Sequence, residues 1–278
     1  MRVIGIDIHP GKKSMIYDGK EFSEKGFNQL KDYLAAIREK NERTLICCDA
    51  PLTGQRAEEK MSEFKYETFK YKIKNNKRYT TPSNSLTKRD IEYFFTNGSE
   101  YNVREIPGIN VGNYSNLSHW TVTKALFGLP IMGTYCQKEL PFKNIHSNSE
   151  IIERQNLYIT EVHPALAIWI WSKRKKIPKK SKIYGYKKGK EGLKKIKELL
   201  LDIDVIKAQD MFSKISNDDQ LDAYISWKLG DLWINEDLKM KVDTVGTSAS
   251  GTFLLPYPGK IQKSFEEFIN SRITIHEV

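Results

Sequence analysis

Two short apolar segments that each end at an aspartate constrain the fold of this chain most. "MRVIGID" (1–7) and "TLICCDAPL" (44–52) have the composition of buried strands, and their acids are Asp7 and Asp49. Between them, apolar residues recur at helical spacing over residues 26–41, which predicts an amphipathic helix. A strand–helix–strand unit connects parallel neighbours by a right-handed crossover, so both carboxylates are expected at the same edge of one sheet.

The rest of the chain extends this unit to a mixed sheet. "IHPGKKSMIYDGKEF", directly after the first strand, has the Gly and Pro punctuation of a hairpin with two more strands. Residues 157–171 combine a strand with an apolar helix, divided at Pro164, and further helices are predicted over 188–203 and 217–233. A hairpin followed by alternating strands and helices predicts an α/β fold with strands of mixed direction.

The length indicates one large domain with an inserted segment. The chain has 278 residues and a hydrophobic content of 39%, enough for a sizeable core. Between Thr53 and Pro130 the strand and helix patterns give way to polar sequence rich in Asn, Lys and Tyr. We therefore predict a single domain over residues 1–278, in which residues 53–130 form a large basic and polar insertion after the fourth strand.

Cysteine usage and hydropathy indicate the compartment. The three cysteines are odd in number, two of them are adjacent in an apolar segment, and none has zinc-ligand spacing. A disulfide framework is not expected, and a reducing cytoplasm fits this pattern. No apolar segment approaches the length of a membrane span, and the N-terminus lacks a signal-peptide pattern, so no membrane partner is expected. The sequence does not indicate an oligomeric state.

Positive charge is concentrated in one segment. The chain carries a net charge of +10, and residues 173–197 contain thirteen Lys or Arg and a single acid. Two interpretations are open: a solvated charged surface, or a strip that binds phosphates, with Tyr184 and Tyr186 stacking on bases. The second interpretation predicts contacts to nucleic acid from six lysines of the strip: Lys175, Lys176, Lys179, Lys180, Lys187 and Lys188.

The segment "NDDQLDA" (217–223) crowds acids onto the start of a buried helix. Asp219 and Asp222 are three residues apart and share one helix face, where like charges repel. A capped first turn stabilised by the helix dipole explains Asp218 well. It explains Asp222 poorly, because that residue lies one turn further into the helix.

A bound metal ion would account for the crowding. Asp7, Asp49, Asp219 and Asp222 come from three distant segments, and the predicted sheet edge brings them together. Hard cations such as Mg²⁺ or Mn²⁺ take carboxylate ligands, and two such ions can hydrolyse a phosphodiester. Taken singly, none of these motifs is specific, and for Asp7 and Asp49 a cap of the turn after each strand is the simpler explanation.

Four sequence blocks resemble one family. "GIDIHPG" (5–11), "CDAPL" (48–52), "EVHPAL" (161–166) and "NDDQLDA" look like the signature blocks of the DUF429 family, predicted nucleases of the ribonuclease H-like superfamily. The first and last blocks also resemble the pattern of RuvC-type resolvases. The resemblance implies a mixed five-stranded ribonuclease H-like sheet flanked by helices. By position, it implies Asp7, Asp49, Asp219 and Asp222 as metal ligands and Glu161 as a further catalytic residue.

These observations predict a cytoplasmic, metal-dependent nuclease that cuts DNA or RNA by two-metal hydrolysis. Asp7 is expected to bridge the ions, with Asp49 on one and Asp219 or Asp222 on the other. His9 and His163, next to this site, are candidates for proton transfer or for structural hydrogen bonding. Two alternatives remain: a non-catalytic nucleic-acid-binding protein on the same fold, and an ATP-dependent phosphotransferase of the actin-like branch.

Overall fold

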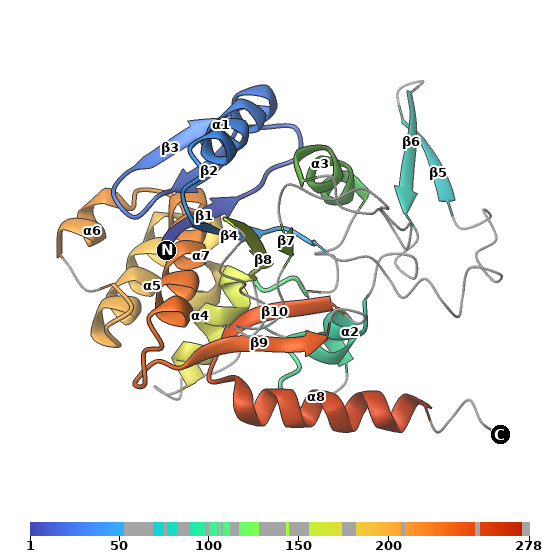
Figure 1. The fold of residues 1–278 in the computed structure, drawn as a ribbon. Coiled ribbons are helices and arrows are strands. Elements are labelled where there is room, and N and C mark those ends of the chain that lie inside the picture. The colour runs from blue at the N-terminus through green and yellow to red at the C-terminus, as the bar shows by residue number, and fades with distance from the viewer. Residues whose placement is uncertain are drawn as a thin grey trace.

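The part of the chain that the structure describes folds as an α/β protein (Figure 1). This computed structural model describes residues 1–52, 69–74, 77–82, 89–97, 100–104, 106, 108–111, 117–127, 143–144, 156–173, 182–206, 209–247 and 251–273. The strands are β1 (Arg2–Asp7), β2 (Ser14–Tyr17), β3 (Phe22–Lys25), β4 (Thr44–Asp49), β5 (Phe69–Lys74), β6 (Lys77–Pro82), β7 (Lys143–Asn144), β8 (Leu157–Glu161), β9 (Val242–Thr247) and β10 (Gly251–Pro256). The helices are α1 (Phe27–Glu39), α2 (Asp90–Asn97), α3 (Leu117–Phe127), α4 (Pro164–Lys173), the 3₁₀ segment η4 (Lys182–Lys188), α5 (Lys190–Asp202), α6 (Gln209–Lys214), α7 (Asp218–Ile234) and α8 (Pro258–Ile273).

The main sheet has the strand order β3-β2-β1-β4-β8-β7. The first three strands form the predicted antiparallel meander, whereas β4 and β8 run parallel to β1, and the two-residue strand β7 pairs with β8 at the edge. Helix α1 leads from β3 into β4, so the connection from β1 to its parallel neighbour β4 consists of the β2–β3 hairpin and this predicted helix. The expectation of a mixed α/β sheet flanked by helices is therefore confirmed.

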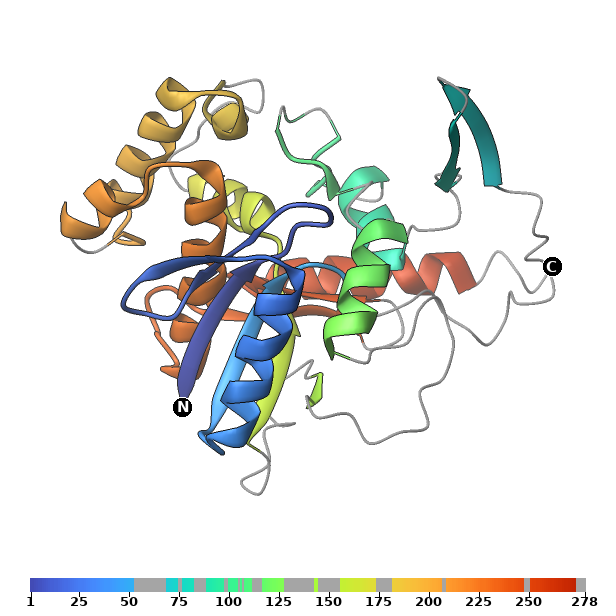
Figure 2. The same cartoon turned by 90° about the horizontal axis from the view of Figure 1, so that it is seen from above.

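The two faces of the main sheet bury different side chains. In β1, Ile4 and Ile6 belong to a core cluster with Leu34 of α1, while Val3 belongs to the larger cluster that includes α4, α5 and α7. This is the alternation of a buried strand, in which successive side chains point to opposite faces. Figures 1 and 2 show α1 on one face of the sheet and α7 on the other.

Helix α7 lies directly on β1, and Gly5 makes this possible. A Cβ atom at Gly5 would lie 2.1 Å from the carbonyl oxygen of Ala223 and 2.3 Å from the backbone nitrogen of Trp227. Gly230 does the same further along α7, where a Cβ atom would lie 2.4 Å from Sγ of Cys47. These glycines fix the distance between α7 and the ends of β1 and β4.

A second, smaller layer completes the described fold. Strands β9 and β10 pair antiparallel, and Val162 after β8 forms a bridge with Leu254 of β10. Helix α2, within the predicted insertion, buries Phe94 against Phe265 of α8, so this part of 53–130 belongs to the core. The β5–β6 hairpin stands apart from the main sheet in both views (Figures 1 and 2). Among the described residues, no helix has the length and apolarity needed to cross a membrane.

Candidate metal centre

Asp7 and Asp49 are neighbours at the carboxyl edge of the main sheet. Each ends its strand, and the two are register partners in the parallel pair β1–β4. Asp7 follows Val3 and Gly5 at two-residue intervals, so its side chain lies on the face that α7 covers. Burial leaves Asp7 only 3% exposed. The sequence pattern therefore predicts this pair of carboxylates correctly.

The first turns of α7 bring two more carboxylates to the same edge. Asn217 caps the helix, because its side chain accepts a hydrogen bond of 2.8 Å from the backbone N–H of Gln220. Asp222 is almost fully buried, whereas Asp219 is partly exposed. This capped start, on a helix held against β1 by Gly5, aims both carboxylates at Asp7.

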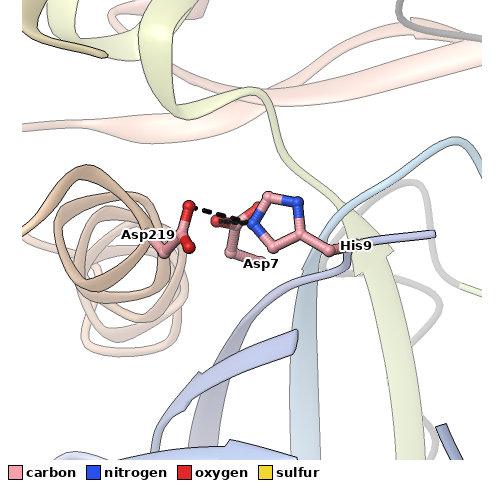
Figure 3. Close-up of side chains that lie close together, drawn as sticks. All are labelled: Asp7, His9 and Asp219. Atoms are coloured by element: carbon pink, nitrogen blue, oxygen red, sulfur yellow. Dashed lines mark hydrogen bonds and ion pairs between the residues drawn. The ribbon is translucent and has the colours of Figure 1, made fainter. Parts of the chain in front are cut away.

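The four aspartates form two groups of potential metal ligands that share one member. The first group is Asp7, Asp49 and Asp222, and the second is Asp7, His9 and Asp219. In each group the ligand atoms lie within 4.8 Å of one another. Figure 3 shows the second group, in which β1, the loop after it and α7 each contribute one side chain. Asp222 and Asp49 therefore belong to one potential metal position, and Asp219 and His9 belong to the other.

Two neighbouring side chains hold the Asp222 carboxylate. Lys187 of η4 places its Nζ 2.6 Å from Oδ2 of Asp222, and the Tyr186 hydroxyl donates to Oδ1 at 2.5 Å. Burial raises the pKa of Asp222 to about 6, with Lys187 opposing the shift and the charge of Asp7 adding to it. Burial disfavours the Lys187 ammonium, but Asp222 and the other nearby carboxylates raise its pKa well above the ordinary value. An ammonium thus lies beside the all-carboxylate group.

The second group has its own counter-charges. His9 Nε2 lies 2.8 Å from Oδ2 of Asp7 and 3.1 Å from Oδ1 of Asp219, and Lys12 Nζ lies 2.9 Å from Oδ2 of Asp219. Burial alone would lower the pKa of His9, but the hydrogen bond and charge of Asp7 raise it. Burial opposes the ionised form of Asp219, yet Lys12 and His9 lower its pKa overall.

Glu161 does not join either group, and the sheet register explains why. Its register partner is Cys48 of β4, not Asp49, so the Glu161 side chain starts on the opposite face from the aspartates. Its oxygens accept hydrogen bonds from both terminal nitrogens of Arg89, at 2.7 and 2.5 Å, and from the backbone N–H of Leu52 at 3.0 Å. Glu161 thus forms a buried ion pair that fixes the chain leaving β4, outside both ligand groups, and its catalytic role stays a prediction.

Among the described lysines of the basic strip, Lys187 is the one that contacts a site residue. Lys187 contacts Asp222, so its position differs from that of a lysine on an open phosphate-binding surface. The side chain of Lys188 and the whole of Lys175, Lys176, Lys179 and Lys180 lie outside the described residues. Tyr184 and Tyr186 are both 2% exposed, and their hydroxyls bond to Ser172 and Asp222, so the prediction that they stack on bases is wrong.

Histidines also lie at or near the site, and the strand pattern indicates the position of His9 alone. His9 continues the alternation of β1 two residues after Asp7, and this spacing is the one sequence signal for its place beside that carboxylate. His119 of α3 was not expected here. Burial lowers the pKa of His119, and the charges of His9 and Asp7 also act on it. His163 has a structural role, since its Nδ1 accepts a hydrogen bond of 3.3 Å from the backbone N–H of Leu166 in α4.

The donor atoms of both groups suit a divalent cation. Carboxylate oxygens are the preferred ligands of hard ions, and imidazole is a common ligand of first-row transition metals. In comparisons with protein-family models, with curated proteins and with solved structures, no match to this chain was found. The functional conclusion therefore depends on the geometry of these side chains and on the motifs that carry them.

Proposed function

We propose that this protein is a metal-dependent nuclease that hydrolyses phosphodiesters of nucleic acid with Mg²⁺ or Mn²⁺ as its cofactor. One observation carries the proposal: Asp7 belongs to two ligand groups, with Asp49 and Asp222 on one side and His9 and Asp219 on the other. A carboxylate shared by two potential ion positions suits two-metal hydrolysis of phosphodiesters, in which two neighbouring ions act on the attacking and the leaving oxygen.

The strand order supports a ribonuclease H-like assignment. An antiparallel meander followed by parallel strands on its far side, β3-β2-β1-β4-β8, agrees with the five-stranded sheet that the motif resemblance implies. The acids lie at the carboxyl ends of the parallel strands, where open α/β sheets bind ligands. We extend the proposal to membership of the DUF429 family and to a cytoplasmic location, which the two buried free thiols of Cys47 and Cys48 fit.

The chain's own side chains divide the work at such a site. When bound, divalent cations would activate the attacking water and stabilise the leaving oxygen. Asp7 would hold both positions, while its burial keeps its carboxylate in one orientation. Lys187 and Lys12 form ion pairs with Asp222 and Asp219. Once released from these carboxylates, the two ammonium groups would be available to the phosphates of the substrate.

Nucleic acid is the partner that the charge distribution favours. The net charge of +10, with thirteen basic residues between 173 and 197, suits a polyanion more than a small neutral substrate. On α5, Lys194 and Lys195 are exposed but lie near Glu198 and Glu191, at 3.8 and 2.6 Å. Glu191 and Glu198 reduce the excess of positive charge on α5, so the proposed contact with nucleic acid relies mainly on the segment before α5.

A nuclease assay with matched variants tests the proposal. Purified protein with Mg²⁺ or Mn²⁺ should cleave at least one form among single-stranded, double-stranded and branched DNA and RNA. Asp7→Asn should abolish cleavage while nucleic-acid binding persists. Asp218→Asn is the matched control, because Asp218 starts the same helix but belongs to neither ligand group. Equal cleavage by wild type and Asp7→Asn would refute hydrolysis at this site, and binding without cleavage would favour a non-catalytic nucleic-acid-binding protein.

A further inference from the structure

The two ligand groups differ in chemistry. One consists of three carboxylates, whereas the other replaces one carboxylate with the imidazole of His9. The two groups share Asp7, so the difference lies in the remaining members. Mg²⁺ prefers oxygen ligands and octahedral geometry, while imidazole nitrogen favours first-row transition metals over Mg²⁺. The two positions should therefore not select the same ion.

The distances in the His9 group are those of hydrogen bonds, and they are also close to the separation of neighbouring ligands around a metal ion. Adjacent ligands of an octahedral ion lie about 3.0 Å apart when each bond is about 2.1 Å long. His9 Nε2 lies 2.8 Å from Oδ2 of Asp7 and 3.1 Å from Oδ1 of Asp219. A single nitrogen thus stands between two carboxylate oxygens at the separation of neighbouring ligands, as Figure 3 shows.

The backbone holds His9 in this place. Its N–H donates a hydrogen bond of 3.1 Å to Oγ of Ser14 at the start of β2, which pins the loop that returns from β1. Asp7 is fixed by β1 and Asp219 by the capped start of α7. Two of the three donors therefore lie on secondary-structure elements and the third on a loop held by a backbone hydrogen bond, and such a shell selects by geometry as well as by charge.

We infer that His9 makes the Asp7–His9–Asp219 position selective for Mn²⁺ or another first-row transition dication over Mg²⁺. The other position, with its three carboxylates, accepts either ion. This inference shares the metal site with the proposed nuclease function, but it concerns which ion binds and does not depend on hydrolysis. The competing role for His9 is that of an imidazolium that merely neutralises the two aspartates.

Pulsed electron paramagnetic resonance of the intact wild-type protein with Mn²⁺ tests this directly. A bound His9 gives a ¹⁴N coupling to the manganese, which carboxylates cannot give. His9→Gln keeps a polar side chain of similar length and should remove that coupling. Calorimetric titrations of both proteins with Mn²⁺ and with Mg²⁺ give the affinity ratio. Because removing even an outer-shell partner costs roughly 10- to 100-fold in metal affinity, His9→Gln should weaken Mn²⁺ binding by at least about tenfold. The Mg²⁺ affinity should change much less.

Lys12→Met is the matched control. Lys12 also contacts Asp219 but brings no ligand atom for a cation, so its loss should change both affinities together and leave their ratio unchanged. Bound Mn²⁺ without a nitrogen coupling in the wild type, or the same Mn²⁺:Mg²⁺ ratio in wild type and His9→Gln, would overturn the inference. A nitrogen coupling in a protein without nuclease activity would support the inference about His9 and count against the proposed function. A wild type that binds no divalent ion would refute the metal site, and with it the inference.

Discussion

The ammonium of Lys187 lies 2.6 Å from Oδ2 of Asp222, beside the three-carboxylate group where a metal ion would bind. The contact joins η4 to α7 through two residues that are 35 positions apart in the chain. It explains how a metal-free chain tolerates Asp7, Asp49 and Asp222 so close together. It also makes Lys187 a competitor of any cation that enters the group.

Lys187→Met should therefore bind Mg²⁺ more tightly than wild type. The side chain of Lys187 is 42% exposed, so the contact is worth about 1 kcal/mol, or roughly fivefold in affinity. Calorimetric titration measures the change, and Lys194→Met on the exposed surface of α5 is the control. A weaker affinity in Lys187→Met would mean that this lysine supports metal binding.

Asp222→Asn should stabilise the metal-free protein at neutral pH and destabilise it relative to wild type when metal is present. The pKa of the carboxyl is about 6 in the folded state and about 3.9 in the unfolded chain. The unfolded state releases its proton first, so wild type loses stability as pH rises from about 4 to about 6. The Asn variant avoids this loss and keeps an acceptor for Tyr186.

Thermal melts of both proteins check this at pH 4 and pH 8, with EDTA and with Mg²⁺. The advantage of Asp222→Asn should appear at pH 8 in EDTA and vanish near pH 4. Added Mg²⁺ should reverse the order, because it stabilises the folded wild type by binding. A variant that melts below wild type by the same margin in every buffer would assign Asp222 a structural role only.

Glu161→Gln should lower stability without changing metal affinity. Arg89 is fully buried between Glu161 and Glu92, and Glu161→Gln leaves Glu92 to balance the guanidinium but turns an amide NH2 group toward one of its donors. The loss of charge-assisted hydrogen bonds to Glu161 should lower the free energy of unfolding by about 2 kcal/mol. Urea denaturation measures it, and calorimetry with Mg²⁺ should give wild-type affinity. Reduced metal affinity with intact stability would restore Glu161 as a site residue.

Gly5→Ala should disturb the metal site by displacing α7 from β1. The added Cβ atom meets backbone atoms of Ala223 and Trp227, which cannot move without shifting α7. We expect a loss of about 3 kcal/mol in stability together with weaker metal binding. Gly259→Ala is the control, because a Cβ atom in that first turn of α8 meets no other atom within 4 Å. Unchanged metal affinity in Gly5→Ala would show that α7 needs no close approach to β1.

The proposed contact between the basic strip and nucleic acid can be tested through the salt dependence of binding, which depends on charge alone. If its lysines contact phosphates, binding should weaken with salt by a logarithmic slope of roughly −0.7 to −0.9 per contact. Replacing the four lysines 175, 176, 179 and 180 by Ala should flatten that slope in filter-binding or fluorescence titrations. An unchanged slope would assign these side chains to a solvated surface.

The sequence alone determines the central strands, helices α1, α4, α5 and α7, and the acids at their ends. Apolar alternation and the crossover helix place Asp7 and Asp49 side by side, and helical spacing places Asp219 and Asp222 on one face of α7. These are local patterns with fixed periods, so they can be counted along the chain. These patterns are sufficient to predict the central strands of the sheet and the convergence of the four aspartates.

Only the tertiary structure decides how these acids are divided and what else reaches them. Glu161 lies on the wrong face because β8 pairs with β4 in the register that sets it opposite Cys48, and a register is a property of two strands together. Likewise, Lys187 reaches Asp222, and His9 reaches Asp219, across 35 and 210 positions of the chain. No periodicity extends over such distances, because long-range contacts form only when separate elements pack against one another.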